Sequence, residues 1–160
     1  MHMKKTVYFS TYCFVTTIVC FAIIIGVGIY LLAKGETVVA YMDFAIVVFL
    51  SMAALFYAPL SLTLTDNALE INRSLRIKAL PLTEIESVKL CQPTMGAIRI
   101  CGSGGYLGYW GWFRERDLGK YFAYYGKSSD CFLVRMKDGR QYMLGCKDAP
   151  EMVAAIQSKL

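Results

Sequence analysis

Two long runs that together contain only one charged residue fill most of the first 58 residues and limit what this chain can fold into. Residues 6–33 are 28 consecutive uncharged residues, and residues 37–58 are 22 more in which Asp43 carries the only charge. As helices they would measure about 42 and about 33 Å, against a bilayer hydrocarbon core of about 30 Å. Only three residues separate them, enough for a tight turn. The sequence therefore predicts a transmembrane hairpin in residues 1–60, with helices at about 6–33 and 37–58.

The flanking charges predict how this hairpin is oriented. Lys4 and Lys5 precede the first run and Arg73 and Arg76 follow the second, whereas the connector offers only Lys34. Basic residues favour the cytoplasmic side, so we expect both termini in the cytoplasm. A cleaved signal peptide is the alternative for the first run, but the apolar stretch is too long and lacks a small-x-small cleavage site.

Polar residues within and beside the runs support a spanning arrangement. Asp43 would lie about 9 Å along the second helix, near the interface, where a carboxylate can reach water. A functional intramembrane acid is the alternative, because such residues are costly. Phenol rings prefer the interface, and the tyrosines divide accordingly between two surfaces. The tyrosines expected near one surface are Tyr8, Tyr12 and Tyr57, and near the other Tyr30 and Tyr41.

From Pro59 onward the pattern changes to alternating apolar and polar residues, typical of strands. We expect a domain at residues 61–160 with about seven short antiparallel strands. The expected strands fall near residues 60–65, 69–72, 75–78, 85–90, 98–100, 131–136 and 141–144, with a further aromatic segment at 120–125. Asp148 is the expected cap of an amphipathic C-terminal helix at 149–160. The predicted fold class is α+β: a two-helix transmembrane hairpin, then a mainly antiparallel β roll or barrel capped by that helix.

Four segments of this domain carry a resemblance to a known family. They are Thr-Leu-Thr-Asp-Asn-Ala-Leu-Glu-Ile (63–71), Ile-Lys-Ala-Leu-Pro-Leu-Thr-Glu-Ile-Glu-Ser-Val (77–88), Gly-Tyr-Leu-Gly-Tyr-Trp-Gly (105–111) and Lys-Asp-Gly-Arg-Gln-Tyr-Met-Leu (137–144). In this order they resemble the bacterial pleckstrin-homology-like (PH-like) domains, over residues 61–160. The resemblance implies a bacterial inner-membrane protein, because such domains often follow transmembrane hairpins, and it implies a binding or assembly module without catalysis.

The most unusual segment alternates glycines with large aromatic residues between Gly102 and Arg116. Trp and Tyr favour the membrane interface, and basic side chains there can meet lipid phosphates. We therefore expect a membrane-touching or partner-binding loop, while a loop folded over the domain's own core is the alternative. The candidate residues are Tyr106, Tyr109, Trp110, Trp112, Phe113, Arg114, Arg116 and Lys120.

Catalytic and metal chemistry lack their usual residues. His2 is the only histidine, at the extreme terminus, and the six cysteines have neither zinc spacing nor a CxxC pair. The acidic pairs Glu84 with Glu86 and Glu115 with Asp117 lie among basic residues, which is typical of solvated surface. We therefore predict no catalytic, cofactor-binding or metal-binding residue.

The predicted function is a non-enzymatic, membrane-anchored scaffold at the cytoplasmic face, with an unknown ligand. Expected partners are the bilayer itself, a protein or peptide, and anionic lipid headgroups. Residues 61–160 carry 14 basic against 10 acidic side chains, too small a surplus to indicate nucleic acid. The alternative is an accessory subunit of a larger membrane complex that acts through the helices. An enzyme would require a convergent polar pocket, for which the sequence offers no candidate.

Overall fold

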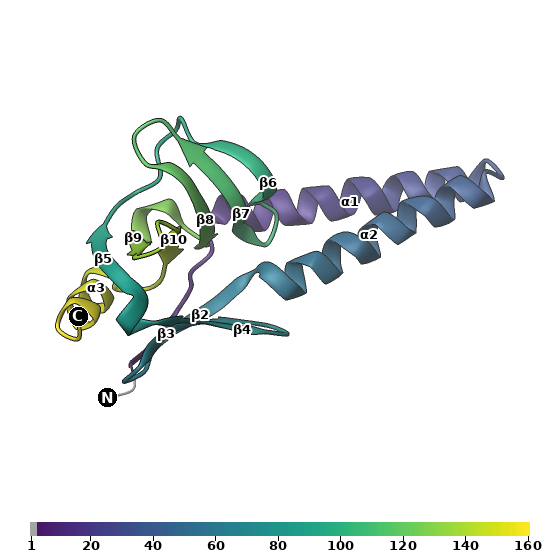
Figure 1. Cartoon of the computed structure of the whole chain (residues 1–160). Helices are drawn as coiled ribbons and strands as arrows, with labels where there is room; N and C mark the ends of the chain where they lie inside the picture. Colours follow the sequence, from purple (N-terminus) through teal and green to yellow (C-terminus); the bar gives the residue numbers. More distant parts are fainter. Residues whose placement is uncertain (1–2) are drawn as a thin grey trace.

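The computed structural model describes residues 3–160, which form a long helix pair and a two-sheet β domain (Figure 1). The elements are β1 (Met3–Thr6), α1 (Thr11–Ala33), α2 (Thr37–Tyr57), β2 (Pro59–Leu64), β3 (Ala68–Arg73), β4 (Ile77–Pro81), η1 (Leu82–Glu84), β5 (Ile85–Leu90), β6 (Ile98–Gly105), β7 (Gly108–Glu115), β8 (Gly119–Tyr125), η2 (Ser128–Asp130), β9 (Cys131–Met136), β10 (Gln141–Gly145) and α3 (Ala149–Gln157).

The helices α1 and α2 run side by side and project away from the strands (Figure 1). Both are long and apolar enough to cross a membrane by length and composition, which suggests membrane association. The tight turn between them uses Gly35 at a φ of +82°, a conformation that glycine adopts without strain. At its other end, α2 stops at Tyr57 because Ala58 is extended and Pro59 cannot continue a helix.

The first helix begins at Thr11 and not at residue 6 as the uncharged run predicted. Residues 3–6 form β1, which pairs with β2 along its whole length, from Met3↔Leu64 to Thr6↔Ser61. The helix then starts where Ser10 Oγ accepts a hydrogen bond from the Cys13 N–H (3.3 Å). Absence of charge identifies residues that a bilayer tolerates, but it does not separate a short strand from the helix that follows. The helix pair is consequently an insertion between two neighbouring strands of one sheet.

The strands form two sheets that face each other without closing. One has the order β1-β2-β3-β4, and the other has the order β5-β9-β10-β8-β7-β6, in which only the β10–β8 pairing is parallel. The predicted architecture of apolar helices, mainly antiparallel strands and a C-terminal helix is thus confirmed. β9 and β10 form a hairpin whose turn contains Gly139 at a φ of +85°.

The main core lies between the sheets and under α3. Leu62, Leu69, Phe132 and Leu144 are fully buried there, together with Met152 of α3. This helix packs on β5 and β9, on the side of the domain away from α1 and α2 (Figure 1). It therefore closes one end of the sandwich and leaves the opposite end for the helix pair.

The start of α3 differs in one respect from the expected cap. Asp148 is the residue before the helix, but its φ of +55° is left-handed and its side chain makes no capping hydrogen bond. Its carboxylate accepts a hydrogen bond from Lys5 Nζ (3.3 Å) of β1. The tertiary ion pair therefore replaces the local cap, which sequence spacing alone cannot reveal.

Candidate functional site

The glycine-aromatic segment is a β-hairpin, which corrects the expectation of a loop. β6 and β7 pair from Ile98↔Arg114 to Gly105↔Gly108, so that residues 106–107 form the turn. Gly102 and Gly111 are cross-strand partners, both at a φ of +121°, and an added Cβ on either would lie 2.2 Å from a backbone oxygen. The glycines therefore permit a close approach of two strands instead of loosening a loop.

One face of this hairpin carries two tryptophans and points toward α2. The indole of Trp110 stacks on Tyr57, with ring centroids 5.6 Å apart and an angle of 12° between the rings. Its Nε1–H donates to the Tyr106 carbonyl oxygen (3.3 Å). Trp112 meets Phe122 of β8 edge-on, with centroids 5.0 Å apart. The last turn of α2 is thus attached to the β domain through aromatic rings.

The opposite face of the hairpin belongs to a second, smaller core. Tyr109 stacks on Tyr125 at 4.7 Å and Phe113 stacks on Tyr121 at 6.1 Å. Phe113 is only 4% exposed, so it packs within its own domain and offers no surface to a partner. Phe113 therefore agrees with the alternative interpretation, in which this segment folds over the domain's own core.

The tip of the hairpin rests on α1 (Figure 1). The Leu107 N–H donates to Thr17 Oγ1 (3.0 Å), and the ring of Tyr106 lies 5.5 Å from that of Phe21. Phe21 is the eleventh residue of a helix that begins at Thr11, so the tip reaches well along the helix. The hairpin therefore contacts both helices, with its tip on α1 and its tryptophan face on α2.

The three basic candidates lie at the other end of the hairpin. Arg114 and Lys120 are exposed cross-strand partners, and Arg116 is exposed in the turn that follows β7. The seven residue-to-residue steps from Leu107 to Arg114 span about 23 Å of extended strand. Lys120 Nζ lies 4.5 Å above the Trp112 ring. The structure thus brings Lys120 and Trp112 together and separates all three cations from the tip.

Glu115 is buried, which corrects its assignment to solvated surface. Its Oε1 accepts a short hydrogen bond from the Tyr121 hydroxyl (2.6 Å), and its Oε2 accepts from Thr94 N–H (3.2 Å) and Thr94 Oγ1 (2.8 Å). Burial and this carboxylate raise the pKa of Tyr121 above its ordinary value. The group is therefore a structural link between the end of β7, β8 and the segment before β6.

Comparison with protein families matches residues 60–160 to the bacterial PH domain. The chain belongs to this family. No curated protein matches the chain significantly, and neither does any solved structure. The matched residues include both sheets except β1, which precedes the helix pair in the sequence and pairs with β2. PH domains are generally binding modules without catalytic activity, so the family directs attention to surfaces more than to reactive groups.

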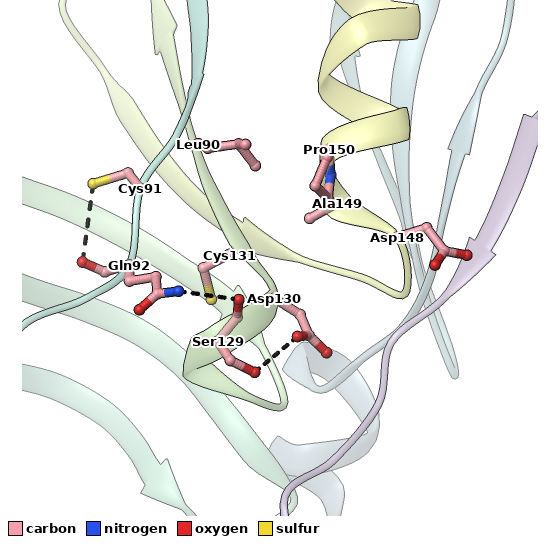
Figure 2. A pocket seen from close by; sticks show the side chains of 9 residues that line it. All are labelled: Leu90, Cys91, Gln92, Ser129, Asp130, Cys131, Asp148, Ala149 and Pro150. Carbon is pink, nitrogen blue, oxygen red and sulfur yellow. Dashed lines mark hydrogen bonds between the residues drawn. The ribbon is translucent and has the colours of Figure 1, made fainter.

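A crevice of about 600 Å³ on the PH domain lies between β5, η2 and the start of α3 (Figure 2). Its polar groups are already paired: Ser129 Oγ donates to Asp130 Oδ1 (2.8 Å), and Cys131 Sγ donates to the Lys127 carbonyl oxygen (3.3 Å). Burial raises the pKa of the Cys131 thiol far above its ordinary value, so the nucleophilic thiolate is disfavoured. The residues that line this crevice therefore contain no activated nucleophile.

Three residues near the tryptophan face were not among the predicted site residues. Tyr57 forms one wall, and Arg73 and Arg76 lie in an adjoining hollow with it. The sequence marked these residues separately, Tyr57 as an interfacial ring and the two arginines as topogenic charges, but gave no sign that they meet. His2 lies outside the described residues. Within residues 3–160, no group of three or more potential metal ligands occurs.

Proposed function

We propose that this PH domain is a non-enzymatic binding module held at the cytoplasmic face of a bacterial membrane, where it takes a protein or peptide partner. The observation that carries the proposal is the insertion of the helix pair between β1 and β2. β1 leads into the helix pair, β2 follows it, and the two strands are paired with each other. The helix pair is therefore joined to the domain by two paired strands and not by a free linker. A partner would meet a surface that is both concentrated at the membrane and fixed in orientation.

The connections between helices and domain are short and hydrogen-bonded. The Val7 N–H donates to the Leu60 carbonyl oxygen (2.9 Å), and the Ser10 N–H donates to that of Gly126 (3.0 Å). A domain held in this way cannot swing freely about α1. We expect it to lie against the bilayer with the β6–β7 tip beside Thr17 and Phe21, in the first half of α1.

Charge and cysteine chemistry support the cytoplasmic side. Lys4 and Lys5 of β1, with Arg73 and Arg76 near the end of α2, are at the domain end, whereas Lys34 is at the far turn. This distribution follows the positive-inside rule. All six cysteines are free thiols, as expected in a reducing compartment.

The free edge of β6 is the surface that we propose for the partner. Among residues 3–160, β6 is the last strand of its sheet and pairs only with β7, so its outer backbone groups can accept another strand. Ile98 and Ile100 on this strand are 68% and 53% exposed. A long edge strand with exposed apolar side chains is usually protected, and a partner strand would protect it.

Site-specific photo-crosslinking in living cells tests this proposal. A photoreactive residue in place of Ile100 should capture a discrete partner, while the same residue at exposed Glu86 of β5 serves as the matched control. The membrane fraction should retain the chain after alkaline carbonate. Equal crosslinking at both positions, or none, would remove the β6 edge as the binding surface, and release by carbonate would remove the anchor.

A second candidate, an accessory subunit that acts through its helices, is favoured by Asp43. Its Oδ2 is buried against Gly28 of α1 and has no hydrogen-bond partner among residues 3–160. Such a group is costly within a bilayer. Replacement of residues 11–57 by an unrelated helical hairpin, with β1 retained, distinguishes the two. The binding module should keep the Ile100 crosslink, whereas an accessory subunit should lose its complex.

A further inference from the structure

An aromatic groove of about 270 Å³ opens on the PH domain beside the end of α2. Its walls are four rings that come from three elements, and its floor comes from β6 and β7. The lining residues are Tyr57, Trp110, Trp112, Phe122, Cys101, Gly102 and Gly111. Almost no polar side chain reaches into it, so its surface is suited to a hydrocarbon and not to a sugar or nucleotide.

The floor of the groove depends on the glycine pair. Gly102 and Gly111 face each other in the β6–β7 register, and neither position has room for a Cβ. The floor is consequently bare backbone, while Trp112 and Phe122 stand edge-to-face as a wall beside it. Cys101 lies at the rim with an exposed thiol.

A cationic hollow of about 300 Å³ adjoins the groove, and Tyr57 lines both. The hollow contains Arg73 and Arg76, neither of which forms an ion pair within the described part of the chain. The Arg73 guanidinium lies 5.7 Å from the centroid of the Tyr124 ring. Its Nε is buried and finds no hydrogen-bond acceptor among residues 3–160. A buried donor of this kind is costly unless an acceptor from outside the chain reaches it.

We propose that the groove and the hollow together bind one anionic phospholipid from the membrane. An acyl chain lies along the rings, and the phosphate accepts hydrogen bonds from Arg73 and Arg76. The charge of the hollow selects an anion, and planar guanidinium groups match phosphate oxygens well. Free phosphate would leave the apolar groove without an occupant. In a zwitterionic lipid such as phosphatidylcholine, the choline cation offsets the phosphate charge and is repelled by the two arginines.

The position of Tyr57 indicates how a lipid would enter the site from the bilayer. α2 ends at this residue, so the junction of groove and hollow is where the helix leaves the bilayer, and a lipid can enter sideways without crossing water. The site rests on the membrane location proposed above. It is separate from the outer edge of β6, so lipid and partner strand do not compete for the same groups.

Native mass spectrometry of the full chain in detergent micelles tests this inference with phosphatidylglycerol and phosphatidylcholine as probes. We expect adducts with phosphatidylglycerol, at least about tenfold weaker in the double variant R73Q/R76Q because each lost charge-assisted contact is worth about a factor of ten. The matched control, R114Q/R116Q, removes the same charge from exposed positions and should bind like the parent.

The apolar half of the site needs its own variants and probe. Cys101→Trp introduces a large ring at the rim and should weaken lipid binding, and bound lipid should slow alkylation of Cys101 while leaving Cys91 of the crevice unaffected. Circular dichroism of each variant establishes that it is folded. Equal adducts with both lipids in all variants, or full competition by inorganic phosphate, would overturn the inference. If carbonate leaves the chain in the membrane but no lipid binds, the anchored binding module stands and only the lipid site fails.

Discussion

The contact between Tyr57 and Trp110 should couple the helix pair energetically to the PH domain. Their rings are nearly parallel, 5.6 Å apart, and join the last residue of α2 to the middle of β7. Stacked aromatic pairs contribute about 0.5–1.5 kcal/mol beyond the area that they bury. Trp110→Ala removes a half-buried indole and one hydrogen bond. It should destabilise the domain by about 3 kcal/mol, the lower end of the range for truncation of a tryptophan to alanine. Tyr57→Leu keeps a similar apolar bulk and should cost less.

A double-mutant cycle isolates the coupling. Unfolding by guanidinium in micelles, followed by circular dichroism, should give a coupling energy of about 1 kcal/mol for Tyr57 with Trp110. The control cycle pairs Tyr57→Leu with Trp112→Ala in the same assay, and should give less than about 0.5 kcal/mol because these two rings make no direct stack. A coupling indistinguishable from zero in the first cycle, or equal in both, would refute the idea that this stack joins the helix to the domain.

Three further predictions concern the domain itself. Gly102→Ala should destabilise it by about 2–4 kcal/mol, because its left-handed backbone and the facing strand leave no room for a methyl group, whereas Gly104→Ala meets only a flexible side chain and should be nearly neutral in denaturant titrations. Glu115→Ala should cost about 2–4 kcal/mol in the same assay, because it leaves the buried Tyr121 hydroxyl without an acceptor. Stability should fall as pH rises from 10 to 12, because burial raises the pKa of Tyr124 to about 12 in the folded state.

The sign of the pH effect follows from proton binding. The folded state keeps the Tyr124 proton at a pH where the unfolded chain, with an ordinary pKa near 10, has lost it, so stabilisation is complete below pH 10. Tyr124→Phe should reduce the fall between pH 10 and 12. An unchanged profile for this variant would contradict the assignment, as would a fully stable Glu115→Ala, or equal effects at the two glycine positions.

Much of the architecture followed from pattern alone. Near absence of charge identified both helices, and period-two alternation identified most strands, because these signals arise within a few residues of each other. The same local logic failed at β1 and at Asp148. Four residues of strand before an apolar helix are recognisable only through their partner strand, and Asp148 bonds a lysine more than a hundred residues away.

For the site, the sequence determined which residue types were available, and the tertiary structure decided which of them meet. Glycines alternating with aromatic residues marked the β6–β7 segment, but a loop and a close strand pair use glycine for different reasons that composition does not separate. Tyr57, Arg73 and Trp110 lie on different elements, and they converge only because β1 and β2 fasten the helix pair beside the open end of the sandwich. Contacts between distant segments depend on chain topology, and local sequence preference carries little information about topology.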